Sequence, residues 1–348
     1  MSKQSTFKRN GKIEFLRFIF ACFIMILHTG YRPQLDIGGY TFRIGERGGF
    51  AVVFFFILSG YLLSDSVNRH LNDDKEDLGS DNIRFIIKKY KQYITWYIPA
   101  FVLCALLDGV QNGIVCMLKN CVKSIPSLLL LGSLGYSSDA ASIGYYVGAS
   151  WYISALFISQ IILYPLLRWN YRRYIQIFAP ILFIATFCVN VLGKSDNISF
   201  AIMCIVMGQF CYETVRYISG YSIGKTTGIG LRILEVILYL MCFLFMSISG
   251  FDDYTYGMRF VAAFAIILSF SRFTEYKFMN SPFFLFLGRI SFPMYLLHIQ
   301  IYKWAEYFFM NNGRNIQDNV FYPLLYVTII ILSAIAYEAE KYLKKRCK

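Results

Sequence analysis

The sequence predicts an all-α polytopic membrane protein with about ten transmembrane helices and both termini in the cytoplasm. Hydrophobic residues make up 57% of the 348 residues and charged residues only 16%, whereas soluble domains carry about 25% charged residues. Leu, Ile and Phe also recur in apolar runs long enough to cross a bilayer, which takes about 20 residues. This length leaves little room for a separate soluble domain, so we expect one membrane domain over residues 1–348.

Ten apolar stretches account for the expected spans. They cover residues 13–30, 48–66, 92–109, 149–168, 174–193, 197–216, 232–250, 256–272, 282–303 and 320–341. The stretch 114–134 is ambiguous, because Lys119 and Lys123 interrupt it and Pro126 follows. We interpret it as interfacial or re-entrant structure in an external loop, and the alternative is an eleventh span.

The distribution of basic residues sets the orientation. With the N-terminus inside, 23 of the 34 Lys and Arg residues fall in cytoplasmic segments and 9 in external ones, while Arg17 and Arg289 lie within spans. Cytoplasmic loops of membrane proteins carry such an excess. An eleventh span would move every later loop to the other side and spoil the asymmetry. We therefore expect a multi-pass protein of the cytoplasmic (inner) membrane with both termini inside.

Charge and cysteine content bear on the partners. The net charge of +13 is explained by basic loops facing the lipid bilayer, so we expect no nucleic-acid partner. The nine Cys residues include no Cys-x-x-Cys pair, so we expect no metal site. Glu14 and Arg17 precede the first apolar run, and no Ala-x-Ala site follows it, which favours a retained first helix over a cleaved signal peptide.

The first span carries the sharpest functional signal. His28 follows Arg17 by eleven residues, and all the residues between them are apolar. At about 100° per residue, eleven residues make just over three turns, so the two side chains share one face about 16 Å apart along the axis. Ionisable residues inside membrane helices are by default functional. Snorkelling of Arg17 to the headgroups and an interfacial hydrogen bond of His28 are the alternatives. Glu14 can pair with Arg17 across one turn.

Three further motifs carry polar groups. Ser59-Gly60 lies in an aromatic helix and permits close approach of a neighbouring backbone. Lys88, Lys89 and Lys91 form a basic cluster before the third span, which either anchors the topology or binds phosphates of an anionic cytoplasmic substrate. Arg289 and His298 lie nine residues apart in the ninth span. They point to opposite faces of an ideal helix, a geometry that Pro293 can bend.

Together these segments resemble the acyltransferase-3 family of integral membrane acyltransferases. Four segments carry the resemblance in order: Ile13-Glu-Phe-Leu-Arg17 with His28, Ala51 to Tyr61, Trp151-Tyr-Ile-Ser-Ala-Leu156, and Gly288-Arg-Ile-Ser-Phe-Pro-Met-Tyr-Leu-Leu-His298. They are similar to the family's Arg-x10-His helix, Phe-Phe-x-x-Ser-Gly helix, Trp-Tyr-Leu-Ser-Ala segment and Gly-Lys-x-Ser-Tyr-x-x-Tyr-Leu-x-His helix. The match runs from about residue 11 to 341.

The chain departs from the family pattern in three places. Val53 stands where many relatives carry Asp or Glu, and Lys89-Tyr-Lys-Gln92 replaces their Arg-x-x-Arg. Lysine meets a phosphate as a point charge and loses the bidentate geometry of arginine. Some relatives carry an appended SGNH-type domain, which we do not expect in a chain that ends at Lys348.

The resemblance implies transfer of an acyl group, usually acetyl from acetyl-CoA, to a hydroxyl of a cell-surface glycan or lipid-linked sugar. His28 would act as general base or as covalent acyl carrier. Arg17, the other member of the catalytic set, would orient a donor phosphate or support the His28 side of the pocket without direct contact with His28. Lys88, Lys89 and Lys91 would bind the donor. Substrate or structural support would come from Glu14, Ser59, Trp151, Arg289 and His298.

Two other functions fit the same charged residues. A flippase or exporter of lipid-linked glycan would line a pathway with them and leave the mass of its substrate unchanged. An acyltransferase for a small molecule would act on a different acceptor. The sequence leaves the acyl group, the acceptor sugar and the oligomeric state open.

Overall fold

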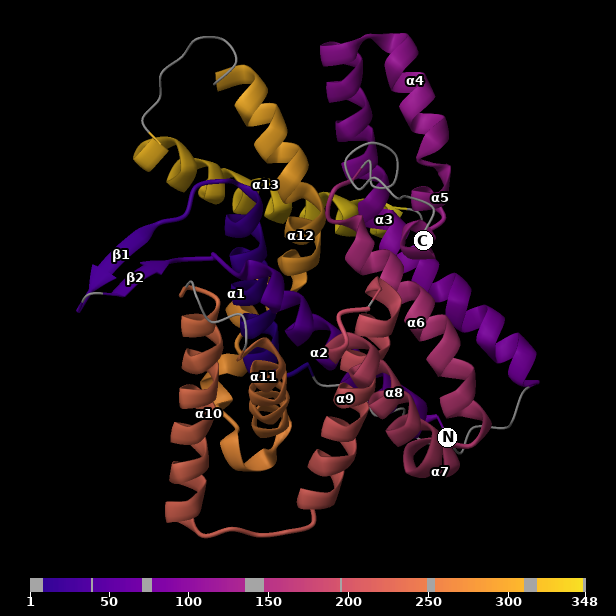
Figure 1. Ribbon diagram of the computed structural model, residues 1–348, viewed down its shortest axis with the longest axis vertical. Coiled ribbons are helices and arrows are strands. Elements are labelled where there is room, and N and C mark those ends of the chain that lie inside the picture. Colours follow the sequence, from indigo (N-terminus) through magenta and orange to yellow (C-terminus); the bar gives the residue numbers. More distant parts are fainter. Residues whose placement is uncertain are drawn as a thin grey trace. The chain divides into compact units, whose positions relative to one another are not determined.

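Figure 1 shows a computed structural model of the chain, which describes residues 9–38, 40–70, 77–134, 147–194, 196–248, 254–309 and 318–346. Most of these residues are helical, and the strands among them form one two-stranded hairpin. The predicted all-α class is confirmed. Two compact units make up the chain: the first comprises residues 1–51, 218–295 and 322–348, and the second 52–217 and 296–321. Whether they act as the single domain expected from the sequence stays a prediction.

The first unit combines α1, a β-hairpin, the whole of α10 and α11, and parts of α12 and α13. Its elements are α1 (Gly11–His28), β1 (Gln34–Ile37), β2 (Tyr40–Arg43), η1 (Gly48–Phe50), α10 (Lys225–Phe245), α11 (Thr255–Phe270), η5 (Arg272–Thr274), η6 (Lys277–Asn280), α12 (Pro282–Phe309) up to residue 295, and α13 (Asp318–Arg346) from residue 322. The hairpin was not predicted. Its second strand is tied to the end of α10, because the Arg43 N–H donates to the Ser247 carbonyl at 2.7 Å.

One face of α10 is buried within the first unit. Glu235, Tyr239, Cys242 and Phe245 are its buried residues, and their spacing of four, three and three places them on one side of the helix. The other sides expose apolar side chains such as Leu240, which is 52% exposed. This pattern is typical of a helix that packs with one face against protein and turns the others to lipid.

The second unit is helical throughout its described residues. Its elements are α2 (Ala51–Arg69) from residue 52, α3 (Leu78–Asn112), α4 (Ile114–Lys123), α5 (Ile125–Leu128), η2 (Gly132–Leu134), α6 (Ser150–Trp169), α7 (Tyr171–Arg173), the π-helical turn η3 (Tyr174–Phe178), α8 (Ala179–Val191), α9 (Asn197–Ile218) and the part of α12 from residue 296.

Two glycines let α2 and α9 cross closely. A Cβ on Gly60 would lie 1.9 Å from the Ile205 carbonyl oxygen, and one on Gly208 would lie 1.9 Å from the Ile57 carbonyl oxygen. Any side chain at either position would push the two backbones apart. The close approach predicted for the Ser59-Gly60 motif is therefore confirmed, with α9 as the neighbouring helix.

Helix α3 is longer than the span predicted at 92–109. It begins at Leu78, where the Asp77 side chain accepts from the Gly79 N–H, and it has 35 residues, which make about 52 Å. Asp81 in its first turn accepts from Arg168 Nε at 2.7 Å and from the Tyr164 hydroxyl at 3.0 Å. These polar contacts with α6 extend the helix beyond the apolar stretch that the sequence pattern detects.

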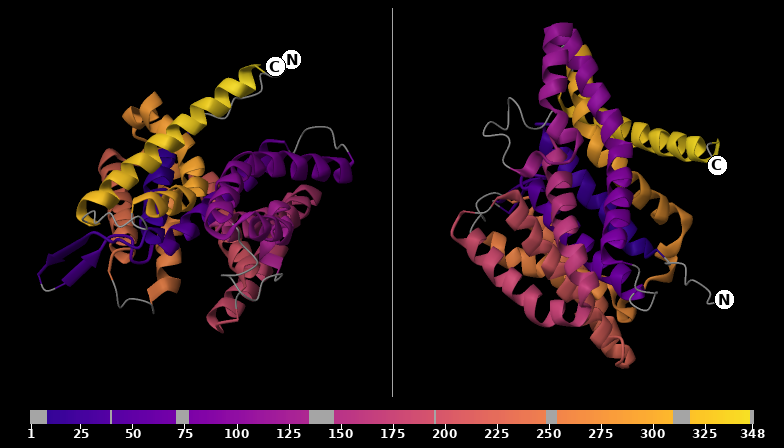
Figure 2. Two further views of the ribbon diagram at one scale, coloured as in Figure 1. Left: turned by 90° about the horizontal axis from the view of Figure 1, so that it is seen from above. Right: turned by 90° about the vertical axis from the view of Figure 1, so that its right-hand side faces the viewer.

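Helix α4 folds back along α3 after a turn at Gly113, which has a φ of 86°. Figure 1 shows the two helices, and Figure 2 gives two further views of the chain. The Asn120 amide donates to Asp108 Oδ2 at 2.9 Å. With ten residues, α4 is about 15 Å long, half the thickness of a bilayer core. No helix long enough to span lies in the described part of 114–134, which favours the interfacial or re-entrant interpretation.

Eight helical segments within the described residues are long and apolar enough to cross a bilayer. They correspond to eight of the ten predicted spans. The other two are α1, which has 18 residues but carries charges in its first turns, and α11, which is apolar but has 16 residues. With α1 and α11 added to the eight, the helices match the ten predicted spans one for one. The number of spans and the cytoplasmic placement of both termini stay predictions.

Candidate active site

Helix α1 places Arg17 and His28 on the side that carries the buried Ala21 and Ile24. The helix runs unbroken from Gly11 to His28, so the shared face predicted for the two residues is retained. Ala21 and Ile24 lie between them at spacings of four, three and four residues, and these two are only 1% and 2% exposed. The four residues form one stripe along α1. Arg17 and His28 therefore lie in line with two residues that pack against protein, one at each end of the stripe.

A hydrogen bond fixes the imidazole of His28. Its Nδ1 lies 2.8 Å from the Ile24 carbonyl oxygen one turn earlier. A carbonyl can only accept, so Nδ1 is the donor, and the neutral ring keeps its lone pair on Nε2. The residue is exposed at the end of α1. The arrangement holds an imidazole in the tautomer that a general base or an acyl acceptor needs.

Tyrosines surround the residues that follow His28. Thr29 is fully buried, and its hydroxyl lies 2.9 Å from the hydroxyl of Tyr326 on α13. Tyr326 in turn donates to the Tyr31 carbonyl at 2.9 Å. The Tyr31 ring stacks on the Tyr322 ring with centroids 4.9 Å apart. The end of α1 that carries His28 is thus tied to α13 by two hydroxyl contacts and one aromatic pair.

Arg17 forms the predicted pair with Glu14. Arg17 donates to Glu14 Oε2 at 2.9 Å, and Arg9 approaches Glu14 Oε1 at 3.7 Å. The Glu14 side chain is 8% exposed, and that of Arg17 is 26% exposed. The carboxylate therefore holds Arg17 against the helix and directs its guanidinium, which favours the pair over snorkelling of a lone arginine.

The Glu14 carboxylate lies against the backbone of α12. A Cβ on Gly288 would come within 1.9 Å of Glu14 Oε2 and 2.4 Å of Glu14 Cβ. Arg289 follows Gly288 directly and is exposed. The structure therefore brings Glu14, Arg17 and the Gly288-Arg289 step together within the first unit.

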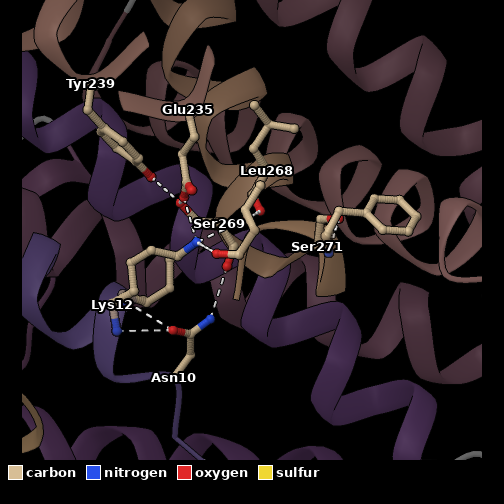
Figure 3. A network of polar contacts seen from close by, with 10 residues as sticks. Asn10, Lys12, Glu235, Tyr239, Leu268, Ser269 and Ser271 are labelled. Atoms are coloured by element: carbon tan, nitrogen blue, oxygen red, sulfur yellow. Dashed lines mark hydrogen bonds and ion pairs between the residues drawn. The ribbon is translucent and has the colours of Figure 1, made fainter. Parts of the chain in front are cut away.

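A second ion pair, which the sequence reasoning missed, holds the beginning of α1. Lys12 Nζ lies 2.7 Å from Glu235 Oε1, and the two side chains are 8% and 3% exposed. Ser269 donates to the same carboxylate oxygen at 2.7 Å and lies 2.8 Å from the Tyr239 hydroxyl. Figure 3 shows this network between α1, α10 and α11. Glu235 could have been noticed, because it is an acidic residue inside the predicted span 232–250.

The ring of Tyr276 covers the Lys12 ammonium, with Nζ 5.0 Å from the ring centroid. Tyr276 lies between η5 and η6, outside the membrane-spanning helices. Burial raises the pKa of the Tyr276 phenol, and the nearby Glu235 carboxylate raises it further. The phenol is therefore neutral at neutral pH and presents its π face to the cation.

The three lysines of the predicted donor site lie on α3 in the second unit. Lys88 and Lys91 are exposed and lie on one side of the helix, since they are three residues apart. Lys89 points elsewhere, with its Nζ 5.7 Å from the Phe85 ring centroid, and Phe85 stacks on Tyr164 of α6. Two of the three ammonium groups are thus directed outwards, and the third lies over aromatic rings.

The remaining predicted residues also belong to the second unit. Ser59 and Trp151 are half-buried, and His298 is 1% exposed in α12. The Trp151 carbonyl accepts from the Ser133 hydroxyl at 2.9 Å, which joins α6 to η2. The Trp151 contact joins two elements of the fold, and a role for Ser59, Trp151 or His298 in substrate binding stays a prediction.

The fold and this geometry define the class of protein. Apolar helices of spanning length make it a multi-pass membrane protein, and its first helix presents an oriented imidazole and a carboxylate-bound arginine. In the described part of the chain, no three His, Cys, Asp or Glu side chains gather as a metal site would require. The chemistry available at α1 is proton transfer or nucleophilic attack by an imidazole.

A family comparison identifies the class of reaction. Residues 10–338 match the acyltransferase-3 family, described as an acyltransferase domain. The chain belongs to this family and is a membrane acyltransferase, which confirms the resemblance seen in the sequence. Comparisons with curated proteins and with solved structures gave no match.

Proposed function

We propose that this membrane acyltransferase moves an acetyl group from acetyl-CoA to a hydroxyl of a cell-surface or lipid-linked glycan. The observation that carries the proposal is the hydrogen bond from His28 Nδ1 to the Ile24 carbonyl, at 2.8 Å. It leaves a lone pair on Nε2 of an exposed imidazole. Imidazole has an unperturbed pKa of about 6.5, so it can exchange a proton near neutral pH.

Two routes use that lone pair. As a general base, His28 Nε2 removes the proton of the acceptor hydroxyl while the oxygen attacks the thioester carbon. The C–S bond breaks, and CoA leaves as a thiolate that takes up a proton. As an acyl carrier, Nε2 attacks the thioester first and releases CoA. The acceptor oxygen then attacks the acyl-imidazolium, the C–N bond breaks, and neutral His28 is restored as the ester forms. The proton of the acceptor hydroxyl passes through solvent to the CoA thiolate released in the first step.

Arg17 has a different role in this proposal, because it lies about 16 Å along the axis from His28. The Glu14 carboxylate orients its guanidinium, which is 26% exposed. A guanidinium in this state can hold a phosphate or thioester oxygen of the donor. Arg289, in the same unit and next to Gly288, is a further candidate. Lys88 and Lys91 of the second unit, both exposed, are proposed on their own charge as contacts for CoA phosphates.

The acceptor side is supported by the tyrosines next to His28. Tyr31 is half-buried and stacks on Tyr322, and Tyr side chains combine an apolar face with a polar hydroxyl. Such side chains suit a sugar, which has apolar C–H faces and hydroxyls at its edge. With the N-terminus inside, this end of α1 faces the outer side of the cytoplasmic membrane, where a surface glycan is met.

The test uses membrane vesicles from cells that express the protein, supplied with acetyl-CoA radiolabelled in the acetyl group. We expect label to appear in the vesicle glycan fraction and to be released by mild alkali, as an O-acetyl ester is. Vesicles from cells that express Arg17→Ala protein serve as the low-activity comparison. Absence of alkali-labile label above vesicles without the protein would refute the proposed donor and acceptor.

The exporter hypothesis predicts a different result in the same vesicles. An exporter would move lipid-linked glycan across the membrane without adding 42 mass units of acetyl, a mass fixed by the chemistry of acetylation. Mass spectrometry of the glycan distinguishes the two. Unmodified glycan that changes sides of the vesicle only when the protein is present would favour the exporter and reject the transferase.

A further inference from the structure

Lys12 and Glu235 form a buried ion pair that the proposed chemistry does not use. The Lys12 ammonium donates to Glu235 Oε1 at 2.7 Å, to the Thr274 carbonyl at 2.8 Å and to the Thr274 hydroxyl at 3.1 Å. An ammonium has three N–H donors, and here each has an acceptor. All the partners lie in the first unit, and Figure 3 shows the Lys12 end of the network.

The residues on either side of Gly11 are held by the same stretch of chain. The Asn10 amide donates to the Ser269 carbonyl at 3.0 Å, and the Gly11 N–H donates to Asn280 Oδ1 at 3.1 Å. A Cβ on Gly11 would lie 1.8 Å from the Met279 carbonyl oxygen. Three consecutive residues, the N-cap Asn10 and the first two residues of α1, therefore contact different parts of the segment 269–280. These contacts fix both the rotation and the axial position of the helix.

Stability alone is a poor explanation for an ion pair at this place. Replacing a buried ion pair with apolar residues of similar volume is often neutral or stabilising. The pair instead fixes the position of α1 along and about its axis, because its hydrogen bonds of 2.7–3.1 Å form in one register only. A slip of α1 by one residue would move Lys12 by about 1.5 Å and turn it by about 100°, and all three bonds would be lost.

The register of α1 also sets the positions of Arg17 and His28. Both lie on the same unbroken helix as Lys12, so a slip or rotation at its beginning reaches His28 undiminished. A misplacement of about 1 Å at reacting groups can cost about 10²-fold in rate. The contacts of Lys12 thus affect the reaction rate by setting the position of α1, and with it the positions of Arg17 and His28.

We propose that Lys12 and Glu235 are a positioning pair for the reaction. By locking the beginning of α1 to α10 and to segment 269–280, they hold Arg17 and His28 in the register that acyl transfer needs. This inference rests on the proposed function, because it assigns the reacting groups to α1. Both side chains are buried among protein groups, so their effect on the reaction comes through the position of α1.

The test compares turnover per folded molecule. Lys12→Met leaves the Glu235 carboxylate buried without its partner and is expected to fold poorly. The double variant Lys12→Met/Glu235→Met removes both charges, and the isosteric Glu235→Gln removes one while keeping an acceptor for Ser269. Folded protein is quantified after solubilisation, and acetyl transfer is measured in vesicles over a range of acetyl-CoA concentrations.

We expect the double variant and Glu235→Gln to show kcat at least tenfold below wild type, with KM for acetyl-CoA within twofold. The matched control is Cys242→Ala on the same buried face of α10. It loosens packing without touching the pair, so it should lower thermal stability and leave kcat per folded molecule unchanged. The exposed pair Lys341–Glu338, replaced by Met at both positions, controls for the loss of charge.

Three results would overturn the proposal. One is wild-type kcat in the double variant and in Glu235→Gln. Another is an equal fall of kcat in Cys242→Ala, which would make the effect one of general stability. The last is failure of both pair variants to fold while Cys242→Ala folds, which would make the pair a requirement for folding. A wild-type protein that transfers no acetyl would instead refute the proposed function.

Discussion

Gly288 and Glu14 are in contact across two helices, with no space for a side chain between them. A Cβ on Gly288 would lie 1.9 Å from Glu14 Oε2, 2.4 Å from Glu14 Cβ and 2.7 Å from Glu14 Cα. The last two distances involve atoms that cannot swing away, so α1 and α12 would have to separate. Because Glu14 also holds Arg17 at 2.9 Å, the glycine is what allows the charged pair to sit between the helices.

Gly288→Ala should therefore reduce both stability and activity. Overpacking typically costs about 1–3 kcal/mol, and the displaced Glu14 would release Arg17. The measurement is the midpoint of thermal unfolding together with acetyl transfer per folded molecule. Gly230→Ala in α10 is the matched control, because no heavy atom lies within 4 Å of its Cβ position, and alanine there should stabilise the helix by about 0.5–1 kcal/mol. If Gly288→Ala and Gly230→Ala had the same unfolding midpoint and the same activity, the close packing of Gly288 on Glu14 would not matter for either property.

The exposed lysines of α3 should support donor binding. Lys88→Gln/Lys91→Gln is expected to raise KM for acetyl-CoA several-fold with little change in kcat, and the effect should shrink at high salt, because exposed charges are screened. Lys119→Gln/Lys123→Gln removes two charges from α4 and should leave KM unchanged. An unaltered KM in the α3 variant would assign Lys88 and Lys91 to anchoring the topology alone.

Tyr326→Phe should slow the reaction without unfolding the protein. The change removes the hydroxyl that contacts Thr29 at 2.9 Å and the Tyr31 carbonyl at 2.9 Å, and so loosens the end of α1 that carries His28. We expect kcat to fall a few-fold and the free energy of unfolding to fall by about 1 kcal/mol, the net contribution of one hydrogen bond. Tyr342→Phe, at a 55% exposed position, is the control and should match wild type.

The cytoplasmic location of both termini can be tested by thiol labelling. Cys347, which lies outside the described residues, should resist a membrane-impermeant reagent in intact cells when the other cysteines are replaced, and should react after permeabilisation. Leu35→Cys in the same background is the positive control, because Leu35 is 55% exposed in the hairpin on the expected outer side. Labelling of Cys347 in intact cells would place the C-terminus outside, and the sides assigned to the donor and the acceptor would have to be exchanged.

The apolar pattern predicted the helical class and the stripe from Arg17 to His28, because both follow from helix periodicity and span length. It did not predict the early start of α3, where Asp77 caps the helix and Asp81 bonds to α6, since these contacts are polar. The pairing of Lys12 with Glu235 joins residues far apart in the sequence, so periodicity could flag Glu235 alone. The hydrogen bond that orients His28 could not be predicted either, because it forms only when α1 is helical as far as His28 and brings the Ile24 carbonyl to Nδ1.

The most direct measurement is acetyl transfer by His28→Gln. Glutamine keeps polarity and hydrogen bonding but cannot titrate, so it can neither remove the acceptor proton nor carry the acyl group. We predict that His28→Gln reaches the membrane at wild-type level, keeps wild-type thermal stability and loses transfer by at least about 10²-fold. The glycan O-acetyl content, measured by mass spectrometry in cells that express each protein, gives the answer. Full acetylation by His28→Gln would reduce His28 to a structural residue and move the search for the reacting imidazole to His298.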